Sequence, residues 1–247
     1  MLRILCLTAA FFMVLAPLET FAQDHAGYRL LQLDGQTVKW GAGAYGEGAT
    51  LTYAFIAQTT EFDDARNCRA MAPVDAVLEA SGLEASDFDA AVAQAFAMWQ
   101  TAAGVSFKKS DDPAAADILI GVDLEGRGWA HADVRAAPST GEVRKITRGL
   151  VCLSADKAWK IGFGSNPGAQ DIRYTISHEI GHVLGLNHPS PSGQVMSFTY
   201  SEGFADLQSG DIEGARALYG APAPSSPAIA SAPANTTIAN APVSQAR

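Results

Sequence analysis

Residues 178–188 constrain the fold of this chain more than any other stretch, because they bring imidazoles within reach of one metal ion. They read HEIGHVLGLNH, with histidines at 178, 182 and 188 and a glutamate at 179. On an α-helix each residue turns by about 100°, so His178 and His182 lie one turn apart on the same face. Glu179 then points about 100° away from His178, beside a shared metal rather than onto it.

The third histidine requires the helix to end. His188 follows His182 by six residues and would face away on a continuing helix. Gly185 can adopt a left-handed conformation, so we expect the helix to break there and His188 to turn back toward the metal. Three nitrogen ligands leave a fourth position for water, as in a catalytic zinc site. The alternative is an amphipathic helix with surface histidines, but three of the five histidines in the chain fall in this stretch.

Composition limits the partners. The 247 residues suit one globular domain with extensions, and the net charge is −9. With a pI near 4.9, this balance argues against nucleic acid or an anionic membrane as a partner.

Residues 1–22 have the pattern of a secretory signal peptide. Arg3 supplies the positive charge, residues 4–15 are apolar, and the sequence TFA at 20–22 is a small-x-small cleavage site. A membrane anchor is the alternative, but the apolar run is too short to span a bilayer comfortably. We expect cleavage after Ala22 and a secreted or periplasmic protein without membrane association.

Two cysteines remain once Cys6 leaves with the signal. In an oxidising compartment this even pair predicts a disulfide between Cys68 and Cys152. The alternatives are two buried free thiols, or a Cys68 thiolate that caps the zinc.

We expect four parts in the chain: a signal peptide (1–22), an N-terminal hairpin and glycine-rich lead-in (23–48), a main domain (49–220) and a tail (221–247). Asp34-Gly35 predicts the hairpin turn. The tail consists mainly of Ala, Pro, Ser, Asn and Thr and should be disordered.

Hydrophobic periodicity predicts the elements of the main domain. Asp171 should cap the helix that carries the histidines, and Ser86 an earlier long helix. The segments 58–72 and 156–170 should be irregular. Helices are expected at 74–80, 86–103, 171–185 and 209–219, and strands at 50–56, 105–109, 116–122, 129–134 and 145–153.

The histidine stretch resembles the zinc signature of the metzincin metalloproteases. Val195-Met196-Ser197 follows it as the Met-turn of that family does, which places a methionine beneath the zinc. Further stretches are similar to matrixin catalytic domains, so the resemblance covers about residues 39–220; they are Lys39-Trp40-Gly41, Ala116-Asp117-Ile118, Ala130-His131-Ala132 and 210–220.

Some features are similar to the serralysin branch of the metzincins, among them His188-Pro189 and Met196-Ser197. In that branch a tyrosine hydroxyl reaches the zinc from the position that Phe198 occupies here. Tyr200, two residues on, is the residue that could supply the hydroxyl instead.

The resemblance implies an α+β or α/β fold: a twisted, mostly parallel five-stranded sheet with an antiparallel edge strand, a long zinc-binding helix, a Met-turn at Met196 and a C-terminal helix. It also implies a specificity pocket, for which Phe198 and Tyr200 are candidates, although both could equally be ordinary core. Substrate would lie extended along the edge strand, for which 129–134 is the candidate.

One catalytic zinc is expected, bound by His178, His182 and His188, with Glu179 as the general base. A second, structural zinc is not expected. Only His131 matches one of its ligands in vertebrate matrixins, and Cys152 falls near another. Calcium is left open, because acidic residues are available between 111 and 133 but no calcium-loop spacing is present.

The expected function is that of a monomeric, exported zinc endopeptidase acting on protein or peptide. Two other classes are the alternatives: a zinc-binding envelope protein without proteolytic activity, and a zinc hydrolase that acts on cell-wall peptide. Glu179 argues against the first, since a purely structural site needs no carboxylate there. Incubation with denatured protein, with and without a chelator, separates the three.

Overall fold

The computed structural model describes residues 27–41, 43–126, 128–164 and 166–223. The predicted signal peptide and nearly all of the predicted tail lie outside these ranges. None of the helices within them has the length and apolarity needed to cross a bilayer.

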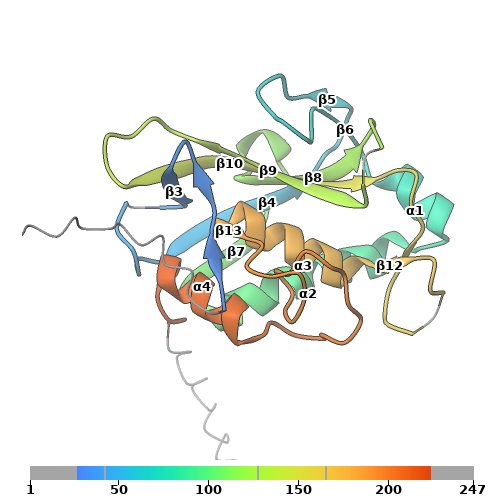
Figure 1. Ribbon diagram of the computed structural model, residues 1–247. Helices are drawn as coiled ribbons and strands as arrows, with labels where there is room; N and C mark the ends of the chain where they lie inside the picture. Colours follow the sequence, from blue (N-terminus) through green and yellow to red (C-terminus); the bar gives the residue numbers. More distant parts are fainter. Residues whose placement is uncertain (1–26, 42, 127, 165, 224–247) are drawn as a thin grey trace, which may run out of the picture.

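A twisted sheet forms one layer of the molecule (Figure 1). Its body is the set of five strands that the resemblance implies. Four run parallel, in the order β7 (Val105–Lys109), β4 (Ala49–Phe55), β8 (Ile118–Asp123) and β10 (Val143–Ser154). The fifth, β9 (Ala130–Ala136), pairs antiparallel with β10 and is the predicted edge strand. β8 is buried along its whole length, as expected of a parallel strand covered on both faces.

Four short strands extend these five, so that the sheet has nine strands within the described residues. β2 (Gln32–Leu33) and β3 (Gln36–Lys39) form the predicted hairpin, and φ is positive at Asp34 (52°) and Gly35 (79°), as a tight hairpin turn requires. β5 (Thr60–Glu61) and β6 (Ala70–Ala72) form a second hairpin, and β6 pairs with the end of β8. The segment 58–72 is therefore less irregular than predicted, because its ends gain backbone hydrogen bonds.

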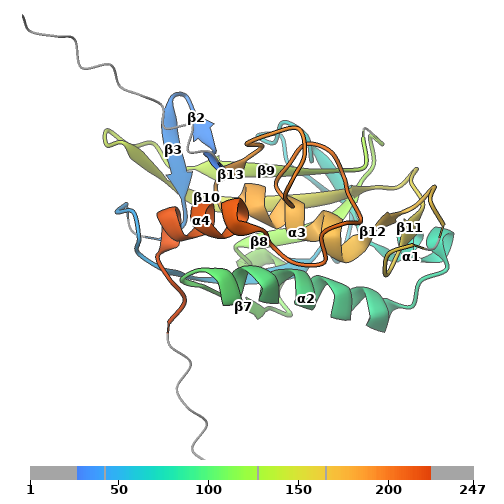
Figure 2. The ribbon, with the colours of Figure 1, turned by 60° about the horizontal axis from the view of Figure 1, so that its bottom comes forward.

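Helices pack beneath the sheet, where α3 (Ile172–Val183) and α2 (Ala85–Ala102) lie next to each other (Figure 2). α2 packs directly on β4, since the rings of Phe96 and Tyr53 stack with centroids 4.0 Å apart. The apolar side chains of Ile176 and Ile180 on α3 are fully buried. A Cβ at Gly149 of β10 would lie 3.0 Å from the Cβ of Val183, so this glycine lets the helix approach the sheet. On the other side, the Trp99 indole of α2 donates a hydrogen bond of 2.9 Å to the Ser177 carbonyl.

The prediction that Ser86 caps α2 is wrong. Glu84 is the N-cap, with extended backbone (φ −75°, ψ 140°) and no side-chain capping bond.

The remaining elements surround α3. The smaller elements are α1 (Asp75–Ser81), α4 (Ser209–Tyr219), the 3-10 helix η1 (Pro113–Ala115), and the paired strands β1 (Arg29–Leu30) with β13 (Leu186–Asn187) and β11 (Trp159–Lys160) with β12 (Gln170–Asp171).

A disulfide joins Cys68 to Cys152, with Cα atoms 5.8 Å apart. Both cysteines are fully buried in an apolar cluster that includes Phe62 and Met71. This cluster is separate from the one that contains the apolar side chains of α3. The disulfide therefore anchors the segment between β5 and β6 to the face of the sheet that is turned away from α3.

Replacing both cysteines by serine should lower the free energy of unfolding by about 2–4 kcal/mol, because the disulfide closes a long loop in the unfolded chain. The two cysteines are 84 residues apart in sequence. Urea unfolding followed by fluorescence measures the change, and the reduced wild-type protein should match the double variant. An unfolding midpoint equal to that of the oxidised wild type would contradict the prediction.

Candidate metal centre

α3 begins and ends at the residues that the sequence indicates. The Asp171 carboxylate accepts a hydrogen bond of 2.7 Å from the Tyr174 backbone N–H and caps the helix. The chain then breaks at Gly185, where φ is 101°. A Cβ at this position would also lie 2.3 Å from the Val38 carbonyl oxygen, so glycine is required both for its conformation and for space. β13 follows directly and leads the chain back to His188.

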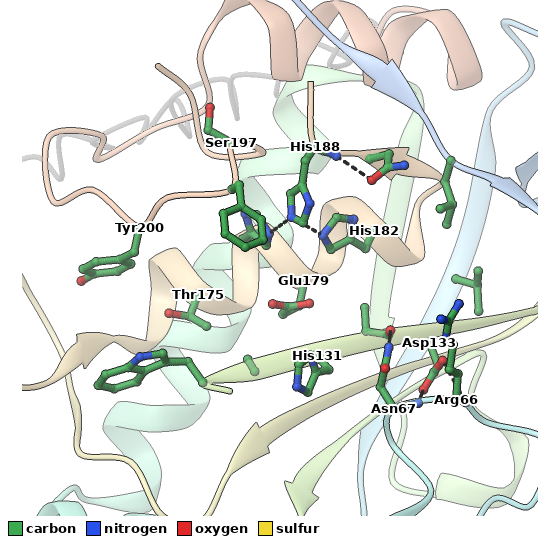
Figure 3. A pocket seen from close by; sticks show the side chains of 18 of the residues that line it. Arg66, Asn67, His131, Asp133, Thr175, Glu179, His182, His188, Ser197 and Tyr200 are labelled. Atoms are coloured by element: carbon green, nitrogen blue, oxygen red, sulfur yellow. Dashed lines mark hydrogen bonds between the residues drawn. The ribbon is translucent and has the colours of Figure 1, made fainter. Parts of the chain in front are cut away.

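The break brings the three histidines together (Figure 3). The Nε2 atom of His188 lies 3.0 Å from that of His178 and 3.1 Å from that of His182. Within the described residues, these three form the one group of at least three His, Cys, Asp or Glu side chains whose ligand atoms all lie within 4.8 Å of one another.

Backbone carbonyls decide which ring nitrogens face inward. His178 Nδ1 lies 2.6 Å from the Val195 carbonyl oxygen, and His182 Nδ1 lies 2.9 Å from that of Leu186. A carbonyl can only accept, so both Nδ1 atoms carry the proton and both Nε2 atoms present a lone pair to the centre.

The imidazoles are also held neutral. Burial lowers the pKa of His178 to about 4 and that of His182 well below its usual value. It lowers the pKa of His188 as well. Protonation, which would block metal binding, is thus disfavoured at neutral pH.

This donor set fits zinc. Nitrogens bound at about 2.0–2.1 Å in a tetrahedral arrangement lie about 3.3 Å from one another, close to the observed separations. Without a metal ion, His188 Nε2 could donate a hydrogen bond to the Nε2 atom of His178 or of His182, but not to both. The lone pair of His188 or of the other histidine would then face another lone pair at close range. A cation at the centre satisfies all three.

The carboxyl group of Glu179 lies beside this centre, on the side of α3 that faces β9 (Figure 3). The residue is 7% exposed, and burial raises the pKa of its carboxyl group to about 8. It borders the same cleft as the histidines without belonging to their cluster.

The turn around Met196 forms the floor beneath the three histidines. Met196 is buried, and a Cβ at Gly181 of α3 would lie 2.1 Å from its sulfur, so this glycine admits the methionine beneath the helix. The Asp211 carboxylate, on α4, accepts hydrogen bonds of 3.0 Å from the backbone N–H groups of both Val195 and Met196. Val195 in turn holds the His178 ring.

Sequence reasoning missed this role of Asp211. In the sequence, Asp211 is only one residue of the stretch 210–220 that is similar to matrixins. Its place three residues after Gln208 suits a helix cap, and the structure does contain that capping box. The contact with the Met-turn depends on how two distant segments pack.

A cleft of about 660 Å³ opens over the centre, between α3, β9 and the segment that follows His188. Phe198 borders it, is 76% exposed, and places its ring 5.3 Å from that of His188. Tyr200 also lines it, but its hydroxyl accepts from the Asp171 N–H (2.8 Å) and is 3.1 Å from Glu202 Oε1, to which it donates. That hydroxyl is therefore engaged at the start of α3 and does not take the place of the serralysin tyrosine.

The sequence of this chain matches one known protein family. The family model described as Matrixin matches residues 75–220. The chain belongs to the matrixin family. The predicted class, a zinc metalloendopeptidase, is confirmed as that of the family.

Three relatives illustrate the similarity in sequence. Metalloendoproteinase 2-MMP of Arabidopsis thaliana is 30% identical over 135 residues, which cover 52% of this chain and 36% of that protein. The hatching enzyme of Paracentrotus lividus is 29% identical over 154 residues (57% and 24%), and the interstitial collagenase of Bos taurus 29% over 151 residues (56% and 29%). The chain thus spans well under half the length of these relatives.

The edge strand of this matrixin presents alternate backbone groups to the cleft. The Ser154 N–H donates 2.8 Å to the Trp129 carbonyl, which fixes the hydrogen-bonded positions of the β9–β10 pair. Alternation along an antiparallel pair then leaves the N–H and C=O of Ala130, Ala132 and Val134 directed away from β10.

His131 belongs to the opposite face of this edge. It stands directly across from Cys152, and residues in register share a face of the sheet. Cys152 lies in the apolar cluster on the side away from α3. The His131 side chain therefore starts from the face of the sheet turned away from α3, and the residue borders the cleft at the edge of the sheet without joining the cluster of three histidines.

Replacing Asp211 by alanine should destabilise the Met-turn, because buried N–H groups lose a charged acceptor. We expect a loss of about 2–4 kcal/mol in the free energy of unfolding, and zinc affinity lower by about tenfold or more as the His178 ring loosens. Urea unfolding and competition with a fluorescent zinc chelator measure the two effects. Asp206→Ala, the same change at an exposed residue nearby, is the control. Equal stability and affinity in both variants would sink the assigned role.

Proposed function

We propose that this matrixin is an exported endopeptidase that hydrolyses peptide bonds, with zinc held by His178, His182 and His188. The observation that carries the proposal is the convergence of three Nε2 atoms, 3.0–3.1 Å from His188 to each partner, in a cleft bordered by a buried carboxyl group. Zinc bound there would supply Lewis acidity, which polarises a carbonyl group and makes water more acidic.

Glu179 is the proton carrier in this proposal. It follows His178 on α3, so its carboxyl group lies beside the three nitrogens and within the same cleft. In its ionised form, the carboxylate would accept a proton from the attacking water and then give that proton to the departing amine nitrogen. Burial keeps bulk water from competing for the group.

The substrate binds as an added strand. The outward N–H and C=O groups along β9 can pair with an extended peptide, which would give affinity without regard to sequence. Phe198 and Tyr200 form the proposed specificity pocket, since both line the cleft and Phe198 is too exposed to be core.

We propose one zinc per chain and no structural zinc. Cys152, which falls near a second-site ligand in the sequence, is bound to Cys68 and cannot ligate a metal. For calcium, one observation is favourable: the buried Asp123 Oδ2 atom has no hydrogen-bond partner within the described part of the chain. Metal analysis of the purified protein measures both ions.

Export and a monomeric state complete the proposal. The signal pattern in residues 1–22 supports export, and the disulfide suits an oxidising compartment. The mass of the mature protein and its elution volume in size-exclusion chromatography test these two points. An uncleaved N-terminus or a dimeric volume would contradict them.

Alanine at position 178 or 188 should remove zinc from the protein, because two ligands bind the ion far more weakly than three. Inductively coupled plasma mass spectrometry after dialysis should give about one zinc per chain for the wild type and a small fraction of that for either variant. His131→Ala is the matched control and should keep its zinc. Full zinc content in His178→Ala and His188→Ala would refute the assignment.

Glu179→Gln should keep zinc but lower the rate of casein cleavage by about a hundredfold or more, because the amide cannot accept a proton. Glu61→Gln, at an exposed position on β5, should cleave at the wild-type rate. Cleavage by Glu179→Gln at the wild-type rate would show that this carboxylate is not the base. No cleavage by the zinc-loaded wild type would refute the endopeptidase proposal itself.

A further inference from the structure

The cleft is bordered at one end by residues 62–69, which we call the disulfide loop. Cys68 ties this loop to β10. The Asp133 carboxylate of β9 accepts hydrogen bonds from the backbone N–H groups of three successive residues, Arg66 (3.2 Å), Asn67 (2.8 Å) and Cys68 (2.7 Å). The backbone that carries the Arg66 side chain is thus fixed to two strands of the sheet.

Asn67 occupies a place on the free edge of β9. Its side-chain Nδ2 donates 3.2 Å to the Ala132 carbonyl. That carbonyl points away from β10 and is one of the acceptors that an added strand would use. An extended peptide on β9 therefore loses its pairing at Ala132 and must leave the edge there, beside the disulfide loop.

Among the residues of the disulfide loop, Arg66 and Arg69 form no ion pair with any other described residue. Asp64 pairs with both Arg135 (2.7 Å) and Arg148 (2.5 Å), and the pKa of its carboxyl group is lowered, mainly by the hydrogen bond from Arg148. Arg66 is exposed, and its guanidinium makes no ion pair with any residue that the structure describes. Among the described residues that line the cleft, it is the one lysine or arginine.

This cation lies on one side of the centre. In Figure 3, Arg66 and Asn67 are on one side of the clustered histidines and Tyr200 is on the other. A peptide that crosses the centre in extended form would therefore bring only one of its halves to Arg66. A planar guanidinium on a fixed backbone suits a carboxylate, which it can bind through two parallel hydrogen bonds.

We propose that Arg66 selects substrates with an aspartate or glutamate side chain at a position on one side of the scissile bond. This inference rests on the proposed endopeptidase function and adds a specificity determinant to it. Arg66 binds the substrate carboxylate, while Asn67 sets the point at which the peptide leaves β9.

A positional library of end-blocked peptides tests the proposal, with cleavage sites read by mass spectrometry. The zinc-loaded wild type should favour acidic residues at one position by about two- to fivefold, as expected of an exposed ion pair. The preference should vanish in Arg66→Gln, turn toward Lys and Arg in Arg66→Glu, and weaken in high salt. Arg69→Gln is the matched control, because Arg69 is exposed on the same loop but does not line the cleft, and it should keep the preference.

A second measurement separates this inference from the endopeptidase proposal. The affinity of the acidic library peptide and of its glutamine counterpart is measured in the Glu179→Gln background, with and without Arg66→Gln. Tighter binding of the acidic peptide that depends on Arg66 supports the inference even if no peptide is cleaved. Cleavage or binding without an acidic preference, or a preference that survives Arg66→Gln, overturns it and leaves the endopeptidase proposal intact.

Discussion

The metal centre depends on two hydrogen bonds in which imidazole Nδ1 atoms donate to backbone carbonyls. The partners are Val195 and Leu186. Without them each ring could rotate or present its protonated nitrogen to its neighbours. Both carbonyls are held by elements that contribute no ligand. Asp211 of α4 fixes Val195, and pairing of β13 with β1 fixes Leu186. Distant parts of the chain thus orient two of the three lone pairs, those of His178 and His182.

The elements that sequence predicts well are those decided locally. The spacing of His178 and His182 favours a helix, and the left-handed glycine at 185 lets the chain turn so that His188 returns to it. β8 and the apolar face of α3 follow from continuous or periodic apolar residues. In each case, neighbouring residues contain all the information that the structure uses.

The features that sequence could not supply are contacts between distant segments. Asp211 looks like an ordinary acidic residue at a helix start, and Gly181 gives no sign that a methionine will pack against it. Tyr200 could have reached the centre, but the Asp171 N–H and Glu202 engage its hydroxyl instead. The hairpin of β5 and β6 was missed because strands of two and three residues have no periodicity to detect. These outcomes are set by packing, which a local pattern does not encode.

The free edge of β9 has a consequence for the kind of target that a protein of this design can use. Its outward backbone groups can be matched only by a chain that has given up its own pairing. A helix or an inner strand of a native protein satisfies those groups internally and has none to offer. The local unfolding free energy of the target, rather than its residue composition, would then set the rate for folded proteins. Frayed termini and open loops would be attacked long before compact cores.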